Sequence, residues 1–197
     1  MYSVYHTEGI ILSSHHKGEA STYLYIFTKE FGLVGANAQG IRELKSKLRY
    51  HLQYLSRIHV ELVNGKTGWR VVNAMGGPYY GNFELESRKE AHAVFARFAA
   101  LLTRLLGGEE KNEGLYETVS AFHDILTKED FTSDELSNIE TVGVMRILNL
   151  LGYWGESNVP LELLSGAIKE PGFFHTVSPM RRLVVREINK ALRETQM

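Results

Sequence analysis

A short polar segment carries four basic side chains whose spacing suits the neutralisation of phosphate groups. It covers residues 40–51, and its cations are Arg42, Lys45, Lys47 and Arg49. Each phosphate that a Lys or Arg neutralises releases bound counterions, which gives affinity for a nucleic acid without any reading of its base sequence. The alternative is a basic turn that is only solvated.

Aromatic side chains alternate with aliphatic ones just upstream of this segment. Tyr23, Tyr25 and Phe27 share one face of a predicted strand, and Leu24 and Ile26 share the other. On the outer face of a barrel, the aromatic rings would stack unpaired bases. We favour the other interpretation, in which the aromatic face belongs to the core, with Phe27 buried and the two tyrosines at its rim.

The sequence carries no recognisable catalytic pattern. It has no Cys, which excludes disulfides, thiolate zinc sites and cysteine nucleophiles. It has no Gly-x-x-x-x-Gly-Lys-Ser/Thr phosphate loop and no Gly-x-Ser-x-Gly elbow. The adjacent His15 and His16 point to opposite faces of a predicted strand, which disfavours a shared metal ion. We therefore expect no enzyme, no metal ion and no other cofactor.

The charge is distributed unevenly along the 197 residues, although the net charge is only −1. Residues 1–80 hold nine Lys and Arg against five Glu, whereas residues 81–197 hold thirteen Lys and Arg against eighteen Asp and Glu. This asymmetry suggests a module that faces a nucleic acid, attached to something else. Neither a long apolar run nor the basic and apolar regions of a signal peptide are present, so we expect a cytoplasmic protein.

The predicted secondary structure that would position these side chains changes from strands to helices near Gly76-Gly77-Pro78. Before this joint, five short strands predict a small barrel, with Asn64-Gly65 as a hairpin turn; they cover residues 9–14, 21–28, 31–38, 54–63 and 69–74. After it the apolar period is helical. The predicted helices cover residues 87–106, 115–126, 132–151, 161–169 and 178–195.

Three cap signals mark the starts of these helices. Ser87 to Glu90 and Thr132 to Glu135 both read as capping boxes, and Ser178-Pro179 predicts an N-cap followed by Pro in the first turn. The expected fold is therefore α+β with two domains, an N-terminal barrel over residues 1–78 and an α-helical domain over residues 79–197.

Several motifs in the first 48 residues resemble those of RecO, a bacterial family of recombination-repair mediators. The matching segments, in order, are Thr7-Glu8-Gly9-Ile10-Ile11-Leu12, Lys17-Gly18-Glu19, Tyr23 to Gly32, Gln39-Gly40-Ile41-Arg42 and Lys45-Ser46-Lys47-Leu48. A weaker match covers residues 145–153, Met-Arg-Ile-Leu-Asn-Leu-Leu-Gly-Tyr. The resemblance implies an N-terminal OB-fold and a C-terminal helical domain, in agreement with the expected elements.

The resemblance also implies a function and a set of partners. These are binding of single- and double-stranded DNA, annealing of complementary strands, and help in loading recombinase onto gaps coated by single-stranded-DNA-binding protein. RecR and the acidic C-terminal tail of single-stranded-DNA-binding protein are the implied protein partners, and the expected location is cytoplasmic, associated with the nucleoid. No membrane and no ATP are implied.

Carried over to this sequence, the resemblance nominates two groups of site residues. Arg42, Lys45 and Lys47 match the family's basic loop, and the full set of candidate DNA contacts is Lys17, Arg42, Lys45, Lys47, Arg49 and Arg57. Arg146, with Leu150 and Tyr153 beside it, is the candidate site for the acidic tail. For Arg146 the alternative is an ion pair on the helix surface.

The sequence departs from the family pattern in three places. Gln39 stands where a Lys is common, and Ser21-Thr22 replaces an Asp-Arg type pair. After Tyr153, where many members carry a four-Cys zinc module, a short segment without Cys follows. Three rival functions therefore stay open: a protein–protein adaptor with weak DNA binding, an RNA-binding OB-fold protein, and an enzyme with an unrecognised site.

Overall fold

The computed structural model describes residues 3–76, 86–166, 168 and 172–195. The chain divides into two compact units, which we treat separately. A barrel unit comprises Met1–Gly81 and Ala99–Tyr116, and a helical unit comprises Asn82–Phe98 and Glu117–Met197. The predicted joint at Gly77-Pro78 lies outside the described residues.

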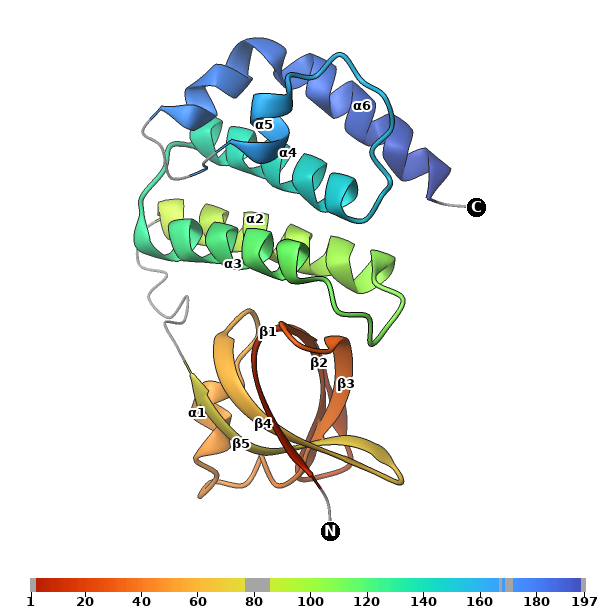
Figure 1. The fold of residues 1–197 in the computed structure, drawn as a ribbon. Coiled ribbons are helices and arrows are strands. Elements are labelled where there is room, and N and C mark those ends of the chain that lie inside the picture. Colours follow the sequence, from red (N-terminus) through yellow and green to blue (C-terminus); the bar gives the residue numbers. More distant parts are fainter. Residues whose placement is uncertain (1–2, 77–85, 167, 169–171, 196–197) are drawn as a thin grey trace. The chain divides into compact units, whose positions relative to one another are not determined.

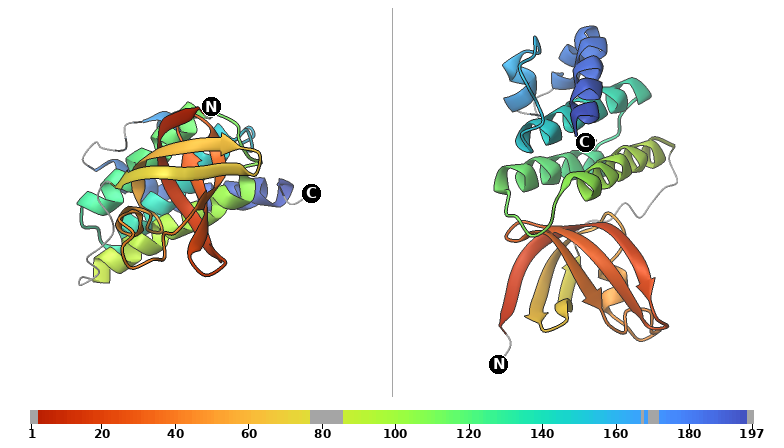
Figure 2. Two further views of the ribbon diagram at one scale, coloured as in Figure 1. Left: turned by 90° about the horizontal axis from the view of Figure 1, so that it is seen from below. Right: turned by 90° about the vertical axis from the view of Figure 1, so that its right-hand side faces the viewer.

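Five strands form the closed barrel of the first unit. They are β1 (Val4–Lys17), β2 (Ser21–Thr28), β3 (Gly32–Ala38), β4 (Arg57–Gly65) and β5 (Gly68–Gly76). The short helix α1 (Leu48–His51) stands between β3 and β4 in the chain (Figure 1). The barrel closes in the order β1-β2-β3-β5-β4, and its strands curve around a common interior (Figure 2). This OB-like arrangement confirms the predicted fold.

Strand β1 pairs with two neighbours. Val4–Ile10 pair with β4, and Gly9–Lys17 pair with β2, so that Gly9 and Ile10 have partners on both sides. The register of the β1–β2 pair shifts between Ile11 and Ser13, as a β-bulge requires. A parallel pairing of β3 with β5 completes the barrel.

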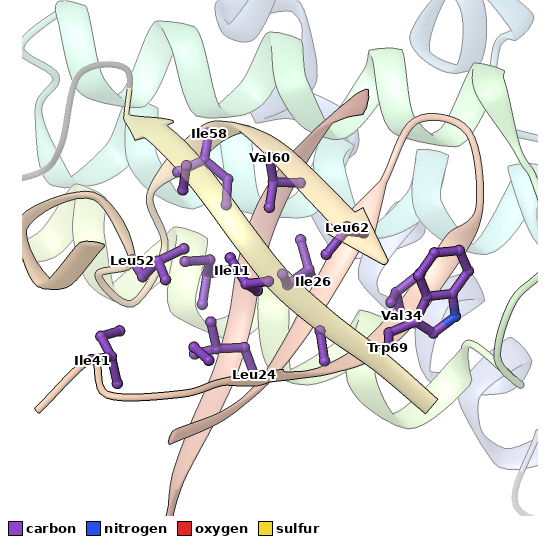
Figure 3. Close-up of a cluster of buried hydrophobic side chains, with 14 residues drawn as sticks. Ile11, Leu24, Ile26, Val34, Ile41, Leu52, Ile58, Val60, Leu62 and Trp69 are labelled. Atoms are coloured by element: carbon purple, nitrogen blue, oxygen red, sulfur yellow. The ribbon is translucent and has the colours of Figure 1, made fainter. Parts of the chain in front are cut away.

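Alternating apolar side chains fill the interior of the barrel (Figure 3). Leu24 and Ile26 of β2 are fully buried there, beside Ile11 and Val34. Burial of each such side chain contributes about 1.5–3 kcal/mol to folding. Because strand side chains alternate, Tyr23 and Tyr25, on either side of Leu24, must face outward.

The prediction that the aromatic face of β2 belongs to the core was therefore wrong for its tyrosines. Tyr23 and Tyr25 are half-buried on the outside of the barrel. Phe27 is fully buried as predicted, but it packs against Tyr116, with 5.6 Å between ring centroids, and not inside the barrel. Three consecutive residues at the end of β2, Ile26 to Thr28, are buried, because Tyr116 of the same unit covers the outer face of the strand at Phe27.

Within the residues that the structure describes, six helical segments follow the barrel. They are α2 (Glu86–Leu105), α3 (Glu113–Lys128), α4 (Ser133–Leu150), α5 (Leu161–Ser165), the 3₁₀ helix η1 (Phe173–Met180) and α6 (Arg181–Glu194). Within the helical unit, the rings of Phe98 and Phe122 meet edge to face at 5.5 Å. Gly143 of α4 lets Phe98 approach, since a Cβ there would stand 2.2 Å from the ring. Within the described residues, no helix is long and apolar enough to cross a bilayer.

The cap predictions had mixed outcomes. Thr132 caps α4 in a full capping box with Glu135, as predicted. The side chain of Ser87 lies outside the described residues. The last helix begins at Arg181 and not after Ser178, because Ser178 accepts a hydrogen bond from Asn138 at 2.8 Å and Pro179 lies within η1. The fourth helix ends at Ser165, four residues earlier than predicted.

Candidate nucleic-acid interface

Aromatic rings and a cation gather on the outer face of β1 and β2. The ring centroids of Tyr23 and Tyr25 are 5.6 Å apart, and the imidazole of His15 lies 5.2 Å and 5.9 Å from them. The Nζ of Lys17 lies 5.3 Å from the centroid of Tyr23. Such a surface offers ring faces to bases and positive charge to phosphates, which is how sequence-tolerant single-strand binding works.

The position of the Tyr23 ring depends on the neighbouring strand. Gly35 of β3 pairs with Tyr25, and Asn37 pairs with Tyr23. A Cβ at residue 35 would stand 2.4 Å from the hydroxyl oxygen of Tyr23 and 3.0 Å from two ring carbons. The tyrosine ring therefore lies across the glycine, in space that any other residue would fill.

The basic segment is tied to the turn between β1 and β2. The backbone N–H of Arg42 donates to the carbonyl of Ala20 at 3.1 Å, and its Nη1 donates to the carbonyl of Gly18 at 3.3 Å. Ile41, by contrast, is buried in the barrel core and anchors the segment. These contacts bring Arg42 to the turn that directly follows Lys17, so two predicted DNA contacts from distant parts of the sequence converge.

The remaining cations of the segment differ in exposure. Lys45 and Lys47 are exposed. Arg49 is half-buried, and its guanidinium lies 5.3 Å from the ring centroid of Tyr50. Tyr50 is 69% exposed, which adds an aromatic ring to the segment that the sequence analysis did not single out.

Arg57 lies in a different environment from the other predicted contacts. Its Nη2 donates to Oε2 of Glu8 at 2.8 Å, and both side chains are about one-third exposed. The hydrogen bond from Arg57 lowers the pKa of Glu8. Arg57 is paired in register with Ile10, whereas Lys17 lies at the far end of β1, so the structure does not bring Arg57 together with Lys17.

Arg146 is buried, with 7% of its surface exposed, and is used inside the helical unit. Its Nε donates to the carbonyl of Leu163 at 2.8 Å, and its Nη2 donates to the carbonyl of Gly166 at 2.6 Å. The guanidinium also lies 5.3 Å from the ring centroid of Phe173. Burial lowers the pKa of Arg146 to about 10, so it is charged at neutral pH. Arg146 is therefore not the ion pair on the helix surface that was the alternative interpretation.

The other two residues predicted for an acidic tail are more accessible. Leu150 ends α4 and is 36% exposed, and Tyr153 is 38% exposed. Gly152 between them has φ +79°, which turns the chain so that the N–H of Tyr153 donates to the carbonyl of Leu148. The nearby cavity of about 690 Å³ is lined by Asn149, by residues 154–159 and by residues of α5 and α6, and neither Leu150 nor Tyr153 lines it.

Two kinds of comparison with known proteins bear on this arrangement. Residues 1–74 match the family model described as Recombination protein O N terminal, which covers the whole barrel apart from the end of β5. The chain is also similar to curated proteins named DNA repair protein RecO. These matches support membership of the RecO family, with the family's N-terminal domain over residues 1–74.

The RecO relatives match over different spans. The protein from Chlorobium phaeobacteroides is 24% identical over 149 residues, 75% of this chain and 55% of the relative. The one from Alkaliphilus metalliredigens is 25% identical over 149 residues, 76% of this chain and 57% of the relative. The one from Thermobifida fusca is 35% identical over 65 residues, 33% of this chain and 27% of the relative. The chain thus spans about half the length of these RecO proteins, or less.

Sequence reasoning found the cations of this surface but missed the residues that shape it. His15, Gly35 and Tyr50 were not assigned to it, and Tyr23 and Tyr25 were placed at the rim of the core. A signal was available in the next strand: Gly35 and Asn37 alternate with Val34, Ala36 and Ala38. Because the apolar residues of paired strands share one face, this phase would have placed the tyrosines outside.

Proposed function

We propose that this RecO-family chain is a recombinational repair mediator that binds single- and double-stranded DNA and anneals complementary strands. In this role it would help to load recombinase onto gaps coated by single-stranded-DNA-binding protein. The observation that carries the proposal is the convergence of Arg42 and Lys17 beside the half-buried, outward-facing rings of Tyr23 and Tyr25. The names of the curated relatives support the same role.

The proposed contacts divide into two kinds. Tyr23 and Tyr25 stack bases, because every base has a ring face and the outer face of strands 2 and 3 is the usual binding surface of an OB-fold. Lys17, Arg42, Lys45 and Lys47 contact phosphates, with Arg49 beside Tyr50 as a further contact. Arg57 contributes less, because Glu8 already neutralises it. This mode of binding needs neither a catalytic residue nor a cofactor.

The protein partners are part of the same proposal. We propose RecR as one partner and the acidic tail of single-stranded-DNA-binding protein as the other. For the tail, Leu150 and Tyr153 are the accessible residues. Arg146 takes part only where Leu163 and Gly166 release its guanidinium.

Fluorescence anisotropy with a labelled single-stranded oligonucleotide tests the DNA-binding role. We expect binding that weakens steeply between about 50 mM and about 200 mM salt, and a double-stranded probe that also binds. The variant Arg42→Glu with Lys47→Glu should lower the affinity at least about tenfold, because each reversal removes a phosphate partner and adds repulsion. Lys29→Gln with Lys111→Gln, two cations of the barrel unit that are paired with Glu113 and Glu30, is the control.

Three results would contradict the proposal. Unchanged affinity in a folded Arg42→Glu, Lys47→Glu variant would remove the basic segment from the interface. An unlabelled RNA competitor that displaces the probe better than DNA would favour an RNA-binding protein. The absence of binding at low salt would favour an adaptor that binds only proteins.

A further inference from the structure

Helix α6 has an apolar face and a strongly basic face. Val184, Ile188 and Ala191 are buried and attach the helix to its unit. Four cations occupy the opposite side of the helix and are exposed: Arg182, Arg186, Lys190 and Arg193. At 100° per residue these four fall within one stripe, directly across from the buried residues.

Most of this positive charge is not balanced by a carboxylate. Arg186 forms an ion pair with its neighbour Glu187 at 3.3 Å, and Arg181, at the start of the helix, lies 3.8 Å from Asp134. Within the part of the chain that the structure describes, Arg182, Lys190 and Arg193 form no ion pair. Three like charges held on one helix face repel one another, which costs folding free energy unless an anion binds.

The concentration of cations on α6 runs against the composition of the rest of this half of the chain. The helix has five Lys and Arg against two Glu. The other residues from 81 onward have eight Lys and Arg against sixteen Asp and Glu. The net acidity of residues 81–197 therefore conceals one basic helix in an otherwise acidic stretch of sequence.

The chemistry of the stripe selects the class of anion. Val185 is the one large apolar side chain exposed on the described part of α6, so the face lacks the row of apolar anchors that an amphipathic peptide would need. Successive cations are about 6 Å apart along the axis and the stripe extends about 16 Å, which suits a polymer with regularly repeated charges. A nucleic-acid backbone has this property.

We infer that the outer face of α6 is a second DNA-backbone site, through Arg182, Arg186, Lys190 and Arg193. This inference rests on the proposed function and extends it. A chain with one site on the barrel and another on α6 holds two strands at once, which raises the local concentration of one strand around the other. Annealing of complementary strands is the activity that such a pair of sites promotes.

The test removes the three cations of α6 that have no ion pair. The variant is Arg182→Gln, Lys190→Gln and Arg193→Gln, which keeps good helix formers at exposed positions. The matched control is Lys89→Gln, Arg104→Gln and Lys128→Gln, which removes the same charge from α2 and α3. A second variant, Arg182→Lys with Arg193→Lys, keeps the charge. Circular dichroism verifies the helix content of each.

Three readouts are compared: the number of oligothymidine molecules bound per chain at low salt, the salt dependence of binding, and the annealing rate of two labelled complementary strands. We expect two oligonucleotides for the wild type and one for the α6 Gln variant. Annealing should slow about tenfold, and the slope of log K against log salt, for a probe long enough to reach both sites, should decrease by about 2. The α2–α3 control and the Lys variant should behave like the wild type.

The outcomes separate this inference from the proposed function. The α6 site is rejected, and the proposed function stands, if the Gln variant matches the wild type in all three readouts while Arg42→Glu with Lys47→Glu weakens binding. If the Gln variant loses only binding to polyglutamate, α6 recognises an acidic protein and the inference is wrong. If the wild type binds no oligonucleotide, both fail.

Discussion

The ring of Tyr23 lies across Gly35, so that a Cβ on residue 35 would stand 2.4 Å from the tyrosine hydroxyl oxygen. The two residues come from adjacent strands, β2 and β3, and Tyr23 also contacts His15 and Lys17 from β1. Gly35 thus leaves the space for the Tyr23 ring, which belongs to β2 and is contacted by residues of β1 and β3.

Gly35→Ala should weaken single-strand binding while leaving the barrel folded. The added methyl group displaces the Tyr23 ring, and base stacking on an aromatic side chain contributes about 1–3 kcal/mol per base. We expect a loss of about tenfold in affinity for oligothymidine by anisotropy. Tyr23→Phe, which keeps the ring, should retain binding. An alanine variant that is folded and binds like the wild type would contradict the stacking role.

Gly143→Ala should destabilise the helical unit. Its Cβ would stand 2.2 Å from Phe98, which is fully buried and is held against Phe95 and Phe122. Over-packing of a filled core costs about 1–3 kcal/mol, to be measured by urea unfolding. Gly155→Ala is the control, because a Cβ there would meet nothing within 4 Å. Equal stability of both variants would show that the Phe98 ring can move aside.

The main effect of Arg146→Ala should be a lower free energy of unfolding of the helical unit, and not weaker binding of a protein partner. Removal of the guanidinium leaves the carbonyls of Leu163 and Gly166 without their donors, at about 1–3 kcal/mol for each one that stays buried. Urea unfolding measures the loss, and Arg146→Lys should lose less because the ammonium still donates. If the alanine variant has wild-type stability but binds an acidic tail peptide more weakly, the contact with the tail dominates.

The ion pair of Arg57 with Glu8 should stabilise the barrel in a pH-dependent way. Because the pKa of Glu8 is lowered in the folded chain, this stability is present above the unfolded carboxyl pKa and is lost as the pH falls through the folded value. Arg57→Gln should therefore cost stability at neutral pH, by less than about 1 kcal/mol, and nothing in strong acid. Urea titrations of Arg57→Gln, Glu8→Gln and the double variant at both pH values isolate the pair.

The same substitution tests the role of Arg57 in binding. Since Glu8 neutralises Arg57 locally, Arg57→Gln should change the affinity for single-stranded DNA by less than about twofold. A loss as large as that of the Arg42 and Lys47 variant would return Arg57 to the interface.

Local pattern was sufficient for much of this fold. The bounds of all five strands were predicted within a few residues, apart from the N-terminal extension of β1. The Thr132 capping box predicted the start of α4. Both signals are local, because alternation and caps depend only on neighbouring residues. Which face of β2 points into the barrel was not predictable from that strand alone, since both of its faces are apolar enough to be buried. It depends on pairing with β3, which is a tertiary choice.

The candidate site shows the same division. The cations at 42, 45 and 47 were evident from their spacing, but their meeting with Lys17 required the hydrogen bonds of Arg42 to the β1–β2 turn. Arg146 was nominated from the family resemblance, yet its hydrogen-bond partners lie 17 and 20 residues further along the chain. Long-range partners of this kind leave no signal in local spacing.

Strand β1 pairs with β4 through its first half and with β2 through its second, so its removal would expose two strand edges at once. Unpaired edges are templates for association with other chains. We therefore expect that the barrel does not open gradually from its N-terminal strand. Gly9 and Ile10 lie where β1 is flanked by both β2 and β4, so their amide hydrogens should exchange with solvent only when the whole barrel unfolds. A truncation that reaches them should convert a monodisperse protein into an aggregating one.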